Sequence, residues 1–117
     1  MKREMKEVLD NLRRDGIIGM AIVDKEGEII TSKLPSQVHE ETFGIMSATV
    51  IGASSSANSE LGRGSVETAV LHSSLGKIVL ANTDVGLILC LVTNESFDIQ
   101  TIFDDIKNAV ERLNMVF

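Results

Sequence analysis

The sequence predicts an α/β (α+β) fold built on a five-stranded, mostly antiparallel sheet, and three observations predict it. Segments with helical and strand periodicity follow one another in the order α-β-β-α-β-β-β-α along the 117 residues. Short turns join the strands within each group, and such turns make neighbouring strands antiparallel. With 44% hydrophobic residues, the chain can bury one core without disulfides or metal ions. We therefore expect a single domain over residues 1–117.

The chain begins with an amphipathic helix, expected to end at Asp15-Gly16, and continues into a β-hairpin. Residues 17–23 form an apolar run without alternation, as in a strand buried on both faces. Residues 28–32 alternate between polar and apolar, as in an edge strand. The turn between them is Asp24-Lys25-Glu26-Gly27, whose aspartate is expected to accept backbone N–H groups and whose glycine can adopt a positive φ. The buried stripe of the first helix consists of Met5, Val8, Leu9 and Leu12.

A long second helix is predicted over residues 38–61. Ser36 is its expected N-cap and Gly62 its expected C-terminal cap. The helix dipole favours acidic residues in the first turn, where this sequence has two glutamates. Apolar residues at helical spacing predict the stripe that faces the core. That stripe consists of Met46, Val50, Ala53, Ala57 and Leu61.

Three further strands are predicted over residues 65–73, 77–81 and 86–92, followed by a last helix capped by Asp98. Five strands span roughly 24 Å, which two helices nearly cover and one cannot. We therefore expect the terminal helices on one face of the sheet and the second helix alone on the other, partly open face. The apolar residues of the last helix are Ile99, Ile102, Phe103, Ile106, Ala109, Val110 and Leu113.

Two features predict association with another chain. Small residues recur at every fourth position of the second helix, from Gly44 to Ser56, and such a surface lets another helix backbone come close. The alternatives are packing of this surface on the chain's own sheet, or a loosely held helix end. The strand over residues 66–73 has only Glu67 as a fixed charge and no proline, so its edge is poorly protected against pairing. A covering loop is the alternative there.

Composition and motifs exclude several classes of function. The net charge of −6 and the absence of Trp and Tyr argue against nucleic-acid partners. No stretch approaches the roughly 20 apolar residues of a membrane span, and one cysteine, Cys90, fits a reducing cytoplasm. His39 and His72 lack neighbouring metal ligands, and no phosphate-binding loop occurs. We therefore expect a cytoplasmic protein that is not an enzyme and needs no cofactor or metal.

The ordered set of motifs resembles the Roadblock family of dynein light-chain and GTPase-regulator proteins. The resemblance is carried by residues 16–19 before the first strand, residues 23–27 at the hairpin, the small-residue helix, residues 61–64 before the third strand, and the closing helix. It implies a profilin- or longin-like fold and a homodimer in which the third strands join and the second helices lie side by side. It also implies a scaffold or regulator that binds a small Ras-like GTPase.

Two other functions remain open at this point: a light-chain-like structural adaptor of a larger assembly, and a small-molecule sensor that uses the uncovered sheet face as a pocket. A partner could dock across the paired helices, where acidic groups would steer a basic surface; the glutamates could equally serve only the helix dipole. The candidate partner surface consists of Glu40, Glu41, Ser54 and Asn58. The candidate dimer interface consists of Gly44, Ser47, Ala48, Ile51, Gly52, Ser55, Glu67, Ala69 and Leu71.

Overall fold

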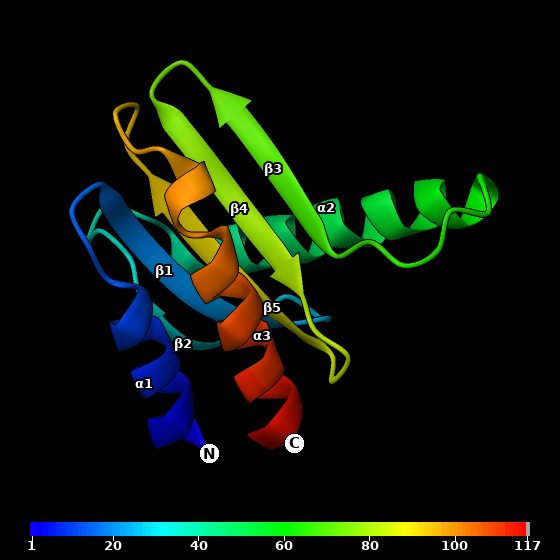
Figure 1. Cartoon of the computed structure of the whole chain (residues 1–117), viewed down its shortest axis with the longest axis horizontal. Helices are drawn as coiled ribbons and strands as arrows, with labels where there is room; N and C mark the ends of the chain where they lie inside the picture. Colours follow the sequence, from blue (N-terminus) through cyan, green and yellow to red (C-terminus); the bar gives the residue numbers. More distant parts are fainter. Residues whose placement is uncertain (117) are drawn as a thin grey trace.

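The computed structural model describes residues 1–116, and these residues form one sheet with helices on both of its faces (Figure 1). The predicted element order is confirmed, with one addition, a short 3₁₀ turn before the last helix. The elements are α1 (Lys2–Leu12), β1 (Ile17–Asp24), β2 (Ile29–Lys33), α2 (Glu40–Glu60), β3 (Thr68–Ser73), β4 (Gly76–Asn82), β5 (Leu87–Thr93), η1 (Ile99–Thr101) and α3 (Phe103–Val116).

The five strands lie in the order β2-β1-β5-β4-β3, and every neighbouring pair is antiparallel. The central position of β1, β4 and β5 agrees with their continuous apolar sequences, and β2 and β3 form the edges as predicted. Cys90 in the middle strand pairs with Ala21 on one side and with Leu80 on the other. All three residues are fully buried, so the centre of the sheet is part of the core.

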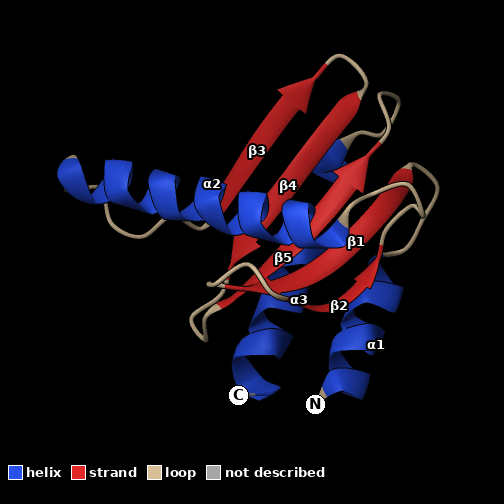
Figure 2. Cartoon of the chain, turned by 180° about the vertical axis from the view of Figure 1, so that it is seen from behind, coloured by secondary structure: helices blue, strands red, loops and turns tan. Residues whose placement is uncertain are grey.

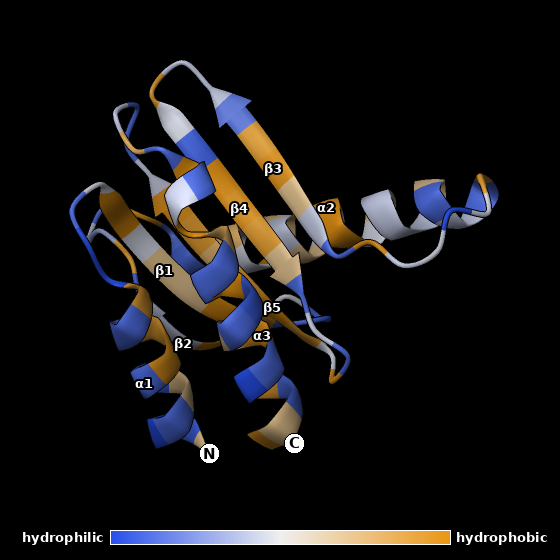
Figure 3. Cartoon of the chain, in the orientation of Figure 1, coloured by the Kyte–Doolittle hydropathy of each residue, from blue (hydrophilic) through white to orange (hydrophobic). Residues whose placement is uncertain are grey.

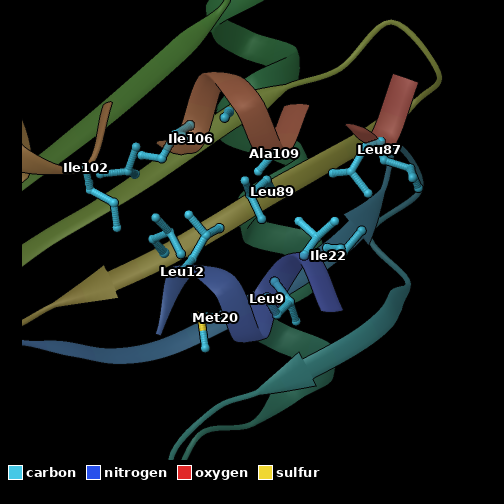
Figure 4. Packing of buried hydrophobic residues seen from close by; sticks show 14 of the residues in the cluster. Leu9, Leu12, Met20, Ile22, Leu87, Leu89, Ile102, Ile106 and Ala109 are labelled. Carbon is cyan, nitrogen blue, oxygen red and sulfur yellow. The ribbon is translucent and has the colours of Figure 1, made fainter. Parts of the chain in front are cut away.

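The terminal helices α1 and α3 share one face of the sheet, as expected, and together enclose the larger part of the core (Figure 4). The predicted stripe of α1 is confirmed in full, because all four of its residues are buried. Leu12 of α1 and Leu113 of α3 are among the fully buried side chains of this layer. At the surface, the Arg14 guanidinium lies 3.0 Å from the carboxylate of Asp105 and joins the two helices.

Helix α2 lies on the opposite face, but of the five residues predicted to face the core only Val50 packs against it. Met46 is 52% exposed and Leu61 71% exposed. Ala53 and Ala57 are exposed, and Val50 is half-buried. The small-residue side is buried instead, at Gly44, Ser47 and Ile51.

The physical reason is the short distance between α2 and the β1–β2 turn. The Cα of Gly44 lies against the carbonyl oxygen of Gly27, where a side chain would overlap that oxygen. A helix can approach a turn so closely only through residues with little or no side chain. The alternative of packing on the chain's own sheet therefore applies to the first half of this helix.

The ends of several elements differ from the predictions. Ser36 is not the N-cap of α2, because a turn closed by the Val38 N–H and the Pro35 carbonyl comes first, and His39 occupies the cap position. Asp98 caps the 3₁₀ turn, where its carboxylate accepts the N–H of Gln100, so α3 begins later than expected. Helix α1 ends three residues before Asp15, since Arg14 hydrogen-bonds the carbonyls of its last turn.

The β1–β2 turn agrees with its prediction. Asp24 accepts the backbone N–H groups of Glu26 at 3.0 Å and of Glu28 at 2.9 Å. Gly27 has a φ of 92° and Gly62, just after α2, a φ of 64°, which are left-handed conformations that favour glycine. Among residues 1–116, no helix is long and apolar enough to cross a membrane.

Candidate protein interface

The second half of α2 projects beyond the edge of the sheet (Figure 2). After Ile51, no residue of this helix is buried. Residues 52–60, which we call the overhang, would measure about 13 Å at the rise of an α-helix. Asn58 donates a hydrogen bond of 2.8 Å to the carbonyl of Gly64 and so holds the following loop against the helix. The overhang is therefore an ordered helix that its own chain covers only in part, with Ser54, Ser55 and Asn58 half-buried and its other residues exposed.

The overhang has the composition of an interface and not of a solvated helix. Residues 42–59 contain no charged side chain, whereas Glu40, Glu41 and Glu60 stand at the two ends of α2. In Figure 3 most of the overhang is pale, which means intermediate hydropathy, until its last turn. Protein interfaces are depleted in charged residues, and isolated exposed helices need polar surface.

The outer edge of β3 is open to another strand. Between Thr68 and Ser73 the strand has no Lys, Arg, Asp, Glu or Pro, as the sequence indicated. Val70 is 43% and Leu71 40% exposed, although both stand in the middle of the strand. Natural edge strands are usually protected by charge, proline or a covering segment, and no such protection is present along this stretch.

A third apolar surface lies on the same face of the sheet as α2. It is near the β3–β4 turn, where α2 does not cover the strands. A hollow of about 240 Å³ is lined there by residues that include Ile18, Leu75, Ile78 and Val92. Leu75, at the β3–β4 turn, is the most exposed of these at 74%. We call this surface the open sheet face. It adjoins the β3 edge, because Leu71 pairs with Ile78 across β3 and β4.

Of the residues that were predicted to form a dimer interface, the structure buries some and leaves others accessible. Gly44, Ser47 and Ile51 are buried against the chain's own sheet, so little of their surface can reach a second chain. Gly44 and Ser47 are small because they pack within the chain, and Ile51 belongs to its core, so these three positions do not support the helix-pairing hypothesis. Ala48, Gly52 and Ser55 line a hollow of about 240 Å³ beside Lys25, and a Cβ on Gly52 would meet no atom within 4 Å.

Of the predicted interface residues outside α2, two belong to β3 and one precedes it. Ala69 and Leu71 pair with Leu80 and Ile78 and share with them the α2 side of the sheet. Glu67 lies just before β3, with its carbonyl accepting the N–H of Asn82. The strand is shorter than residues 65–73, since pairing of the strand begins at Thr68.

The four residues of the predicted partner surface do not form one cluster. Glu40 and Glu41 stand in the first turn of α2, and the Glu40 carboxylate accepts a hydrogen bond of 2.9 Å from Ser32. Ser54 and Asn58 belong to the other end of the helix, and 18 residues of helix separate Glu40 from Asn58 by about 27 Å. These four residues can contact one partner only if it spans most of the helix.

The exposed apolar residues of α2 were not predicted to be exposed, because they have the same helical spacing as a stripe that faces a core. The absence of charge over residues 42–59 was the available signal, since a helix buried on one side normally has charges on the other. The missed surface consists of Met46, Ala53, Ala57 and Leu61.

The polar groups of the core do not form a reactive site. Burial raises the pKa of the Cys90 thiol to about 12, although the Ser47 hydroxyl opposes this shift. A thiol with so high a pKa is protonated near neutral pH and therefore unreactive. Within residues 1–116, no three His, Cys, Asp or Glu residues gather in a way that could hold a metal ion.

A family model, sequence relatives and solved structures match this chain. A model of the Roadblock/LC7 domain matches residues 4–93 of this chain. An uncharacterised protein of Methanocaldococcus jannaschii is 29% identical over 110 residues, which cover 94% of this chain and 92% of that protein.

Solved structures show the same fold. Myxococcus xanthus MglB superposes with a TM-score of 0.90 at 17% identity, over 99% of this chain and 89% of that chain. The gliding protein MglB of Thermus thermophilus superposes with a TM-score of 0.87 at 18% identity, over 97% of this chain and 88% of that chain.

Proposed function

The chain belongs to the Roadblock/LC7 family, and from that premise we propose that it is a homodimeric regulator or scaffold that binds a small Ras-like GTPase. In this proposal it acts by binding, as a single domain in the cytoplasm, without a cofactor or metal. The observation that carries the proposal is the uncharged overhang of α2 next to an unprotected β3 edge. Both surfaces are costly to leave in water, and a second copy of the chain can cover both at once.

In the proposed dimer, β3 pairs antiparallel with β3 of the second copy, and each overhang crosses onto the other copy's sheet. The overhang measures about 13 Å and strands are about 4.8 Å apart, so it can pass its own β3 and reach the neighbouring sheet. A twofold axis at the middle of β3 brings each overhang towards the β3–β4 turn of the other copy. The open sheet face, with Leu75 and Ile78, lies at that end.

The two α2 helices then meet along the exposed apolar residues of α2 that the sequence had predicted to face the core. Gly52 is on the flank of α2 near Lys25, where both line the same hollow. Val50 and Ala57 lie about 140–160° around the helix from Gly52, on the opposite flank. The proposed interface therefore differs from the predicted one in its helix residues, while it keeps Ala69 and Leu71 of β3.

The GTPase partner is inferred from the family and not from a nucleotide site in this chain. A dimer with adjacent α2 helices offers one continuous surface that a monomer lacks. The net charge of −6 would steer a basic patch of the partner and increase its association rate. Glu40 and Glu41, which stand exposed at the start of each α2, are the residues that would supply this steering.

The test compares binding of Ras-like GTPases from the same organism, loaded with GDP or with a non-hydrolysable GTP analogue. The proposal predicts nucleotide-dependent binding that is lost in a monomeric variant such as Ala57→Glu. Binding that ignores the nucleotide would favour the light-chain-like adaptor, and absence of binding in both states would reject the GTPase partner. Reversal of Glu40 and Glu41 to Lys should slow association without dissociating the dimer.

A further inference from the structure

We propose that the groove between α3 and β3, on the face of the sheet opposite α2, binds an amphipathic helix with basic residues from another protein. All the residues that line the groove belong to one copy of the chain. It adds a second binding surface to that of α2.

The groove arises because two helices cannot cover five strands. Helices α1 and α3 lie over β2, β1, β5 and part of β4, and together they cover about 20 Å of a sheet about 24 Å wide. The strand left over on this face is β3 (Figure 1). Thr68, Val70 and His72 point to this face, since they pair with Ala81, Val79 and Lys77 of β4 and the first two of those belong to the core below α1 and α3.

The floor and one wall of the groove are apolar. Ile106 and Val110 of α3 line it together with Ala81 of β4, around a hollow of about 340 Å³. Val70 continues the floor at the edge and is 43% exposed. Ile106 is buried and Val110 half-buried, so side chains that enter the groove would pack mainly on Val110 and extend a core layer that is already present.

The rim of the groove is acidic. Glu67, Asp84 and Glu111 line it, against one lysine, Lys107. Glu67 and Glu111 are exposed, and neither takes part in an ion pair among residues 1–116. Three carboxylates around an apolar floor are complementary to a helix with apolar residues on one side and Lys or Arg along its flanks.

The dimensions fit a helix. The lining residues of α3 run from Phe103 to Asn114, which corresponds to about 17 Å or three helical turns. A helix placed beside α3 would continue the layer of α1 and α3 with the spacing of about 10 Å that packed helices adopt, and it would extend beyond the outer edge of β3. An extended peptide would instead add to the β3 edge through its backbone and leave this floor exposed.

The proposal is tested with a fluorescently labelled peptide of about 14 residues, made of leucine and lysine at helical spacing. A peptide of the same composition in scrambled order is the control for charge. Binding is measured by fluorescence anisotropy, and the contact is located by backbone amide NMR shifts of the full chain. We expect the amphipathic peptide to bind and to shift the signals of Thr68, Val70, Lys107 and Val110.

The variant Glu67→Lys/Glu111→Lys should weaken binding by about tenfold at low salt, because it removes two of the three rim carboxylates. Glu26→Lys/Glu95→Lys is the matched control, since it changes the net charge equally at exposed loop positions elsewhere. Val70→Asp should weaken binding by placing a charge on the apolar floor. Equal losses in both double variants, shifts confined to α2, or failure of the amphipathic peptide to bind better than the scrambled one would each overturn the proposal.

Discussion

The backbone of Gly44 in α2 lies against the carbonyl oxygen of Gly27 in the β1–β2 turn, with no space for a side chain between them. The contact is close in the other direction too, since a Cβ on Gly27 would stand 2.7 Å from the Cα of Ile45. This pair of glycines sets the distance between α2 and the sheet. It thereby determines which side of α2 is buried and which remains available to a partner.

Replacing Gly44 with Ala should destabilise the protein by about 1–3 kcal/mol, because the added methyl group forces α2 away from the turn. Gly52→Ala in the same helix is the control. Its Cβ would meet no atom within 4 Å, and alanine favours a helix interior over glycine by about 1 kcal/mol. Urea unfolding of both variants tests this. Equal effects of the two substitutions would contradict the close contact.

The variant Ala57→Glu should dissociate the proposed dimer, since it places a charge on the flank of the overhang that faces the second α2. Ser56→Glu introduces the same charge one residue away, at an exposed position about 100° around the helix. Sedimentation velocity of both variants should detect a monomer for the first and a dimer for the second. A dimer that survives Ala57→Glu would move the interface away from this flank.

Asp24 should stabilise the hairpin and have no part in partner binding. Asp24→Ala removes the acceptor of two backbone N–H groups and should lower the free energy of unfolding by about 1–2 kcal/mol. Asp24→Asn keeps an acceptor oxygen and should have a smaller effect. Thermal melting measures both. A variant that melts normally but no longer binds the GTPase would assign this residue a functional role instead.

Cys90 makes the stability of the folded chain depend on pH in the alkaline range. Its pKa is raised by burial from 9.0 to about 12 in the folded chain, so the thiol keeps its proton there while an unfolded chain loses it above pH 9. This contribution to stability is complete below pH 9 and decreases as the pH rises towards 12, by at most about 1.4 kcal/mol per pH unit. Urea unfolding between about pH 8 and pH 10 should show this slope in the wild type and a shallower one in Cys90→Ala. Parallel pH dependence in the two proteins would be inconsistent with a protonated, buried thiol.

Most of the fold could be predicted from the sequence, because the apolar patterns of its elements other than α2 are clear. The apolar residues of α1 lie on one side of the helix, as do those of α3, so only that side can face the core. The continuous apolar runs of β1 and β5 require a central position in the sheet. The order of elements then leaves β2 and β3 at the edges. These predictions rest on the spacing of apolar residues within each helix and strand, and short turns mark where each element ends.

The orientation of α2 could not be predicted, because both of its sides are uncharged over residues 42–59. Periodicity favoured the larger side chain of Met46 as a buried one. The close approach at Gly27 leaves Met46 exposed instead, and it depends on a contact between residues far apart in the sequence. The groove beside α3 was missed for a similar reason, since Glu67 and Glu111 come together only in three dimensions.

The molar mass of the wild-type chain in solution, measured by light scattering at micromolar concentration, tests the proposed dimer most directly. The open β3 edge and the uncharged overhang predict twice the 12.7 kDa of one chain. A mass of 12.7 kDa, unchanged on raising the concentration about tenfold, would contradict the dimer and with it the proposed continuous surface for a GTPase.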